Sequence, residues 1–328
     1  MEHRQVSIFG SLPDGEPVRL VRLSGGGLSV EVLSFGATIR ALQFDGWPMV
    51  LSLGRLEDYT GASGHMGAVA GRFANRINGG RFVLNGTVHQ LTCNEAGITH
   101  LHGGARGFGR RNWRLVDVGP QTVTLAHDAA NGEEGYPGAL AATCTYSIPT
   151  DGALEIRLEA TCDRPTIVNL ATHSYFNLDG DGDIGGHRLE IPADRYLPVD
   201  AHKIPTGQIA DVAGTPFDFR QARTVGGFPY DHAFVLVGGA ATTPRRVARL
   251  VGGRSGVTLD IESTEPALQF YDGHNLNAGQ HGARAGLCLE PQRFPDAPNH
   301  PAFPSAVLRP GETYRQVTRY RFSREDGQ

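Results

Sequence analysis

Apolar and polar residues alternate with a period of two along most of the chain. The clearest stretches lie at residues 28–32, 113–118, 122–127, 154–160, 189–191, 257–262 and 314–322. Successive side chains of a β-strand point to opposite faces, so this alternation predicts half-buried antiparallel strands. Helical periodicity is scarce, and only residues 56–59 indicate a single helical turn.

Turn-forming clusters separate these stretches, at residues 12–15, 85–86, 130–132, 150–152 and 309–311. Glycine occupies 44 of 328 positions, accompanied by 20 prolines, and both residues are poor helix formers. No linker, low-complexity tract or repeat divides the chain. We therefore predict that residues 1–328 form a single large all-β domain, an antiparallel sandwich with very little helix.

The charge and cysteine content exclude several classes of function. With 30 basic and 34 acidic residues, the net charge of −4 gives no electrostatic footprint for nucleic acid or for an anionic membrane. No apolar run is long enough to span a bilayer. The four cysteines form no C-x-x-C pair, so neither a zinc ribbon nor a dense disulfide framework is indicated, and we expect a cytoplasmic protein.

Other chemistry-bearing motifs are incomplete. His100 and His102 form an H-x-H pair, but no further ligand is specified nearby. The acidic run 179–183 has Ile184 where a calcium loop needs glycine, which favours a solvated turn. The sequence has neither a G-x-S-x-G motif nor a P-loop, and no G-x-G-x-x-G precedes a predicted helix. We therefore predict no metal and no cofactor.

Two residues stand out within apolar surroundings. Glu290 ends the run Gly286-Leu-Cys-Leu-Glu, and His173 lies close to Tyr175 and Phe176. A carboxylate in such a strand indicates either a structural salt bridge or a functional acid or base. His173 taken alone is typical of a hydrogen-bonded core histidine.

Six longer motifs occur in order along nearly the whole chain. They are GRFANRINGGRF from Gly71, HLHGG from His100, NLATHSYFNLDG from Asn169, YDHAFVL from Tyr230, EPALQFYDG from Glu265 and LEPQRFPDAPNHPAFPSAVLRPGETY from Leu289. Together they resemble the aldose 1-epimerase (galactose mutarotase) family, which implies a large antiparallel β-supersandwich. One departure is Ala171-Thr172-His173, where the family signature reads T-N-H. It puts a role for the side chain at position 172 in doubt.

The resemblance implies a reaction and a set of site residues. His173 is implied as general acid and Glu290 as general base for opening and reclosing the ring of a free aldohexose such as D-galactose or D-glucose. The residues implied in sugar binding are Asn75, Arg76, His102, Tyr175, Asp231 and Gln269. Acid–base ring opening needs neither cofactor nor metal. We expect burial of Glu290 among its apolar neighbours to raise the carboxyl pKa toward the range of a useful base.

Three alternatives remain at this point. The same sandwich could be a non-catalytic carbohydrate-binding protein, a glycoside hydrolase using Asp231 and Glu290, or a hexose-phosphate 1-epimerase of the same superfamily. The presence of His173 and Glu290 favours an enzyme, and the HLHGG and HSYFN segments favour a free sugar. The preferred aldose, and whether the protein is a monomer or a homodimer, stay open.

Overall fold

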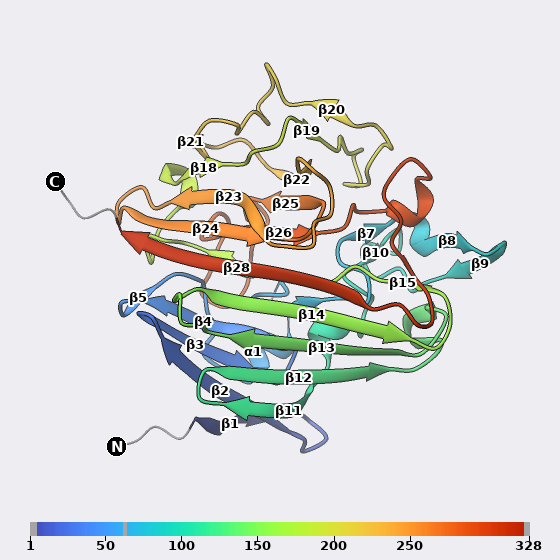
Figure 1. Ribbon diagram of the computed structural model, residues 1–328, viewed down its shortest axis with the longest axis horizontal. Coiled ribbons are helices and arrows are strands. Elements are labelled where there is room, and N and C mark those ends of the chain that lie inside the picture. Colours follow the sequence, from blue (N-terminus) through green and yellow to red (C-terminus); the bar gives the residue numbers. More distant parts are fainter. Residues whose placement is uncertain (1–4, 62–63, 325–328) are drawn as a thin grey trace.

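The computed structural model describes residues 5–61 and 64–324, which fold mainly into antiparallel strands (Figure 1). A nine-stranded sheet forms the front layer in that view. Its strands, in spatial order, are β11 (Arg114–Gly119), β12 (Thr122–Ala129), β13 (Leu140–Ser147), β14 (Leu154–Cys162), β28 (Tyr314–Arg324), β24 (Val257–Ser263), β23 (Arg245–Val251), β18 (Arg188–Glu190) and β21 (Arg223–Thr224).

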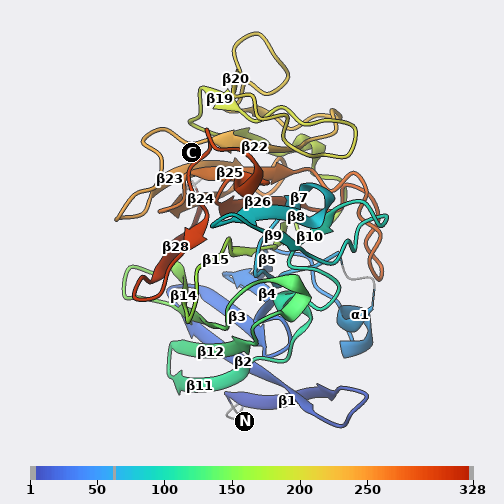
Figure 2. The same ribbon diagram turned by 90° about the vertical axis from the view of Figure 1, so that its right-hand side faces the viewer.

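Two further sheets lie behind the nine-stranded sheet, one above the other in Figures 1 and 2. The lower sheet contains β1 (Val6–Ser11), β2 (Pro17–Gly25), β3 (Leu28–Leu33), β4 (Thr38–Phe44) and β5 (Trp47–Pro48). The upper sheet has the order β17 (Tyr175–Phe176), β26 (Leu287–Gln292), β25 (Ala267–Tyr271), β22 (Asp231–Val235), β19 (Arg195–Tyr196) and β20 (Ala210–Asp211).

Short elements complete the described fold. Two-stranded pairs are β6 (Val69–Ala70) with β16 (Ala171–Thr172), β7 (Arg76–Ile77) with β10 (His100–Leu101), β8 (Arg81–Leu84) with β9 (Thr87–Gln90), and β15 (Thr166–Ile167) with β27 (Val307–Leu308). The helical segments are α1 (Leu56–Thr60) and the 3₁₀ turns Asn78–Gly80, Phe108–Arg110, Glu133–Gly135, Ile184–Gly186 and Ala297–Asn299. The predicted all-β sandwich and the single helical turn are thus confirmed. No helix in the described ranges is long and apolar enough to cross a membrane.

The main hydrophobic core lies between the nine-stranded sheet and the two sheets behind it. Strand β28 contacts both, because Phe322 stacks on Phe44 of β4 and Tyr320 packs edge-on against Phe176 of β17. From the upper sheet, Phe270 of β25 and Leu289 of β26 enter this core. Because side chains alternate along a strand, the residues between these core positions must face the other way.

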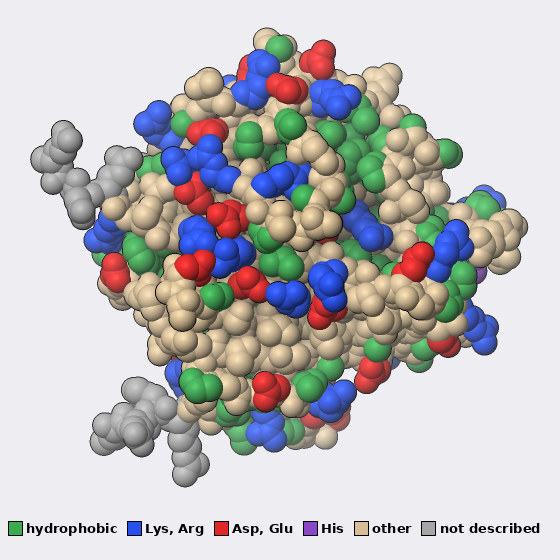
Figure 3. Space-filling view, in the orientation of Figure 1, with side chains coloured by type: hydrophobic (Ala, Val, Ile, Leu, Met, Phe, Trp, Pro, Cys, Tyr) green, Lys and Arg blue, Asp and Glu red, His purple; other side chains and the backbone are tan. Residues whose placement is uncertain are grey.

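The outer face of the nine-stranded sheet carries interleaved charges of both signs over β14, β23, β24 and β28 (Figure 3). Arg319, for example, pairs with Asp151, Glu155 and Glu262, and Arg249 pairs with Asp260. Such mixed surface pairs stabilise the fold only weakly and produce no single-sign field.

A close approach of two backbone segments fixes the loop after β10. Gly103 has φ +87°, and a Cβ added to it would lie 1.7 Å from the carbonyl oxygen of Gly71. Only glycine therefore fits, both for its backbone angle and for the space available. This contact ties the loop carrying His102 to the segment that leads to Asn75 and Arg76.

We expect Gly103→Ala to lower the free energy of unfolding by at least about 2 kcal/mol, because the added methyl must displace backbone. Gly86→Ala is the matched control, since Gly86 has φ +77° with nothing within 4 Å. That change should cost about 1 kcal/mol from the backbone angle alone. Urea unfolding measures both, and equal losses would contradict the close approach.

Candidate active site

The register of the upper sheet places polar side chains in rows on the face away from the main core. Tyr175 of β17 lies opposite Cys288 of β26, which lies opposite Tyr271 of β25, and Tyr271 pairs in turn with Asp231 of β22. In the next row Glu290 lies opposite Gln269. Residues directly opposite one another on one face are close neighbours, so four separate segments converge on one surface.

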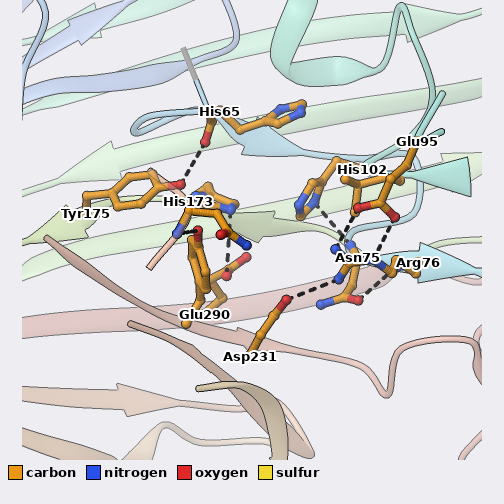
Figure 4. A pocket seen from close by; sticks show the side chains of 13 residues that line it. His65, Asn75, Arg76, Glu95, His102, His173, Tyr175, Asp231 and Glu290 are labelled. Atoms are coloured by element: carbon orange, nitrogen blue, oxygen red, sulfur yellow. Dashed lines mark hydrogen bonds and ion pairs between the residues drawn. The ribbon is translucent and has the colours of Figure 1, made fainter. Parts of the chain in front are cut away.

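A second wall comes from β7 and β10. Arg76 pairs with Leu101, and the backbone N–H of His102 donates to the carbonyl oxygen of Asn75 at 3.1 Å. Asn75 and His102 have φ of 65° and 50°, in the left-handed region that asparagine and histidine enter more readily than most residues. These two bends turn both side chains toward the upper sheet (Figure 4).

Between the two walls lies a cavity of about 240 Å³. Seven of the eight residues proposed from the sequence line it, namely Asn75, Arg76, His102, His173, Tyr175, Asp231 and Glu290. The eighth, Gln269, does not line the cavity. It is buried behind Asp231, to whose Oδ1 its Nε2 donates at 2.6 Å. The structure therefore brings the predicted residues together in one place, with Gln269 one layer deeper.

Arg76 is held between two carboxylates. Its Nε and NH2 groups donate to Glu95 at 2.8 and 2.7 Å, and NH1 donates to Oδ2 of Asp231 at 3.4 Å. Burial alone raises the pKa of Glu95, but the hydrogen bonds and charge of Arg76 bring that pKa below its usual value. The guanidinium is thus fixed in direction and its charge is neutralised locally.

His102 is a neutral hydrogen-bond donor. Burial, and after it the neighbouring His65 and His173, lower the pKa of His102 well below its usual value. Its Nδ1 accepts the backbone N–H of Asn75 at 3.2 Å. In a neutral imidazole the other nitrogen then carries the proton, so Nε2–H is the donor available to a ligand.

Glu290 and His173 are buried side chains of the cavity wall. Glu290 is 2% exposed and His173 is 5% exposed. Burial, reinforced by Asp231, raises the pKa of the Glu290 carboxyl well above its usual value. Burial lowers the pKa of His173 to about 4. In the ligand-free site both groups are therefore driven toward their neutral forms.

No hydrogen bond joins the two groups. The distance from Nε2 of His173 to Oε1 of Glu290 is 3.8 Å, beyond hydrogen-bonding range, and Oε2 of Glu290 is buried without a partner among the described residues. A close salt bridge would occupy the hydrogen-bonding capacity of the Glu290 carboxylate and leave it unable to act on a substrate. Here its oxygens stay available, which favours the functional interpretation of this carboxyl over the structural one.

Several residues of the site were not predicted from the sequence. Tyr271 follows Gln269 by two positions and Cys288 precedes Glu290 by two, so the period of the strands could have indicated both. Glu95 could not have been found in this way, because a loop places it against Arg76. His65 also lines the cavity, with its ring centroid 4.8 Å from that of His102, and burial lowers its pKa to about 3.

Three further residues, Thr172, His100 and Asp179, are hydrogen-bonded to other parts of the fold. Thr172, at the departure from the family signature, points away from the cavity and shares a hydrogen bond with the Tyr320 hydroxyl at 2.9 Å. Both ring nitrogens of His100 are bonded, to the Thr92 carbonyl and the Tyr136 hydroxyl. Asp179 is not solvated as expected. It is buried and accepts the backbone N–H groups of Arg254 and Ser255.

A buried carboxyl and a buried imidazole line one cavity of this β-sandwich, an arrangement typical of enzymes that transfer protons to and from a small polar substrate. Comparison with known proteins agrees. The sequence profile described as aldose 1-epimerase matches residues 19–321. The galactose mutarotase of Mus musculus is 40% identical, with 97% of this chain and 98% of that protein covered. The aldose 1-epimerase of Escherichia coli K12 is 37% identical, covering 95% and 97%.

Solved structures show the same relationship. A homologue of the aldose epimerases from C. elegans has a TM-score of 0.88 at 32% identity, covering 94% of this chain and 99% of its own. Galactose 1-epimerase from Lactobacillus acidophilus has a TM-score of 0.86 at 29% identity, covering 97% and 98%. The chain belongs to the aldose 1-epimerase family. The predicted family and its activity, the interconversion of sugar anomers, are confirmed.

The raised pKa of Glu290 predicts that Glu290→Gln is more stable than the wild type at neutral pH. Above its ordinary pKa of 4.5, the carboxyl ionises in the unfolded chain but keeps its proton in the fold, so rising pH favours unfolding of the wild type only. The stability difference should therefore grow as the pH rises from 5 towards 7, by at most about 1.4 kcal/mol per pH unit. Urea unfolding at each pH measures it. A stability difference that does not change with pH would mean that Glu290 has an ordinary pKa in the folded protein.

Proposed function

We propose that this aldose 1-epimerase interconverts the α and β anomers of free aldohexoses, D-galactose and D-glucose among them, with Glu290 as general base and His173 as general acid. The observation that carries this proposal is the buried, unbonded pair at 3.8 Å on the wall of a polar cavity. Asn75, Arg76, His102, Tyr175 and Asp231 bind the sugar hydroxyls, and Gln269 holds Asp231.

The proton transfers follow from the two groups. Glu290 as carboxylate removes the proton of the C1 hydroxyl while His173 as imidazolium donates a proton to the ring oxygen, and the C1–O5 bond breaks. Rotation about C1–C2 presents the other face of the aldehyde. Both transfers then reverse, which closes the ring as the opposite anomer.

The neutral forms favoured in the empty site correspond to the ring-opened stage of this cycle. After ring opening Glu290 holds a proton and His173 has lost one, so the pair carries no charge. The total number of protons on the pair is the same before and after. Binding of the closed sugar must therefore stabilise the charged pair, and Arg76 contributes because its charge lowers the pKa of Glu290.

The charge of the cavity supports a neutral sugar. Among the described residues that line it, Arg76 is the single Lys or Arg side chain, and it is already paired with Glu95 and Asp231. A phosphate group would meet more negative than positive charge. Asp231 is held by Arg76 and Gln269, which also argues against its use as a hydrolase nucleophile.

Segments spread over most of the chain contribute these groups to one cavity, which supports residues 1–328 acting as a single catalytic domain. Whether the protein is a monomer or a homodimer does not enter this chemistry. The four cysteines are free thiols, which supports a reducing compartment such as the cytoplasm.

Polarimetry of freshly dissolved α-D-galactose and α-D-glucose tests the proposed roles. We expect wild type to accelerate the approach to anomeric equilibrium. His173→Ala and Glu290→Gln should each reduce that acceleration by about 100-fold or more, because each removes one proton carrier.

His89→Ala on β9 and Glu159→Gln on β14 are the matched controls, since neither side chain lines the cavity. Both should keep the wild-type rate. Near-normal rates in the His173 and Glu290 variants would refute the assigned roles, and a wild type that binds sugar without accelerating mutarotation would favour the carbohydrate-binding alternative.

A further inference from the structure

Three side chains of metal-ligating type meet at the wall of the cavity, which two of them line. Cys288 and Glu290 are two residues apart on β26, so they project from the same face of the strand, and His173 packs against both. A ligand atom from each of the three lies within 4.8 Å of the others. In the described part of the chain, this is the one group of three such side chains whose ligand atoms lie this close together.

The distance between the sulfur and nitrogen ligand atoms matches that around a thiophilic divalent cation. With Zn–S near 2.3 Å and Zn–N near 2.0–2.1 Å, the sulfur and nitrogen ligands of a tetrahedral zinc lie about 3.5 Å apart. The Cys288 sulfur and Nδ1 of His173 are 3.5 Å apart. A carboxyl oxygen of Glu290 lies within 4.8 Å of the other ligand atoms, so a small shift of that carboxyl would complete the set.

A second observation also points to a ligand. Oε2 of Glu290 is buried without a hydrogen-bond partner among the described residues, although the residue is only 2% exposed. Such an atom has lost its hydration without gaining a replacement, so a cation would satisfy it. Thiolate, imidazole and carboxylate together are a donor set that suits zinc rather than magnesium or calcium.

We propose that His173, Cys288 and Glu290 bind Zn²⁺, entering through the sugar cavity, and that the bound ion inhibits the enzyme. The thiol and the protonated carboxyl release their protons to solvent as they coordinate. The ion then occupies a carboxylate lone pair of Glu290 and places a positive charge on the His173 imidazole, so metal binding and the proposed proton transfers exclude each other. The inhibition rests on the proposed function, whereas the metal site itself does not.

Direct binding tests the site without reference to activity. Zn²⁺ titration by calorimetry and Co²⁺ absorption, which reports thiolate ligation, should show one metal ion per chain. We expect Cys288→Ser to abolish the thiolate–cobalt band and to weaken Zn²⁺ binding at least about tenfold. Glu290→Gln is a second variant, which should weaken binding while keeping the thiolate band.

The double variant Cys93→Ser/Cys162→Ser is the matched control, because it removes the two partly exposed thiols and leaves Cys288. It should bind Zn²⁺ and Co²⁺ as the wild type does. Absence of stoichiometric binding, or a thiolate band lost in the control and kept in Cys288→Ser, would overturn the proposal.

Activity supplies a separate result. Zn²⁺ should slow mutarotation in competition with galactose, and a chelator should restore the rate. Tight binding at Cys288 without inhibition would refute the inhibitory role while leaving the site in place. Because binding is measured without sugar, a wild type lacking mutarotase activity would contradict the proposed function and would not alter the test of the metal site.

Discussion

The proposed mechanism depends on one carboxyl and one imidazole that are buried together without bonding to each other. Glu290 and His173 lie 3.8 Å apart, close enough to act on neighbouring atoms of one substrate. Burial raises the pKa of Glu290 and lowers that of His173 to about 4. The order of the two proton affinities is thereby reversed, so the empty site favours a protonated Glu290 and a neutral His173, which are the forms that the proposed ring opening produces.

The sandwich supplies this burial through the two faces of the upper sheet. One face sends Phe270 and Leu289 into the main core, which fixes the strands in place. Gln269 and Glu290 are the sequence neighbours of these two core residues, so their side chains point to the opposite face of the sheet. Rigid packing on one side therefore determines where the reactive carboxyl lies on the other, and any slip of register by one residue would exchange core and site. The same alternation places Cys288 on the same face of β26 as Glu290, where its sulfur lies 3.5 Å from Nδ1 of His173.

Much of this architecture could be predicted from the sequence, since alternation identified strands such as β14, β24 and β28. The pairing of strands distant in sequence could not, because no local pattern specifies that β17, β26, β25 and β22 are neighbours. The site residues were predicted from family motifs, which identify residues but do not say how deeply each one is buried. They could not show that Gln269 lies behind Asp231 rather than on the cavity wall. Glu95 could not be predicted either, because its role depends on a contact with Arg76 that a loop creates.

The protonation state of Glu290 in the folded protein is the most direct test of this account. Infrared difference spectroscopy of wild type against Glu290→Gln at neutral pH isolates this carboxyl from Glu265, whose pKa burial raises to about 7. The account predicts the carbonyl band of a protonated carboxyl in the wild type that disappears in the variant and weakens when galactose binds. A difference spectrum containing only carboxylate bands would show that Glu290 is ionised in the empty site and would contradict the account.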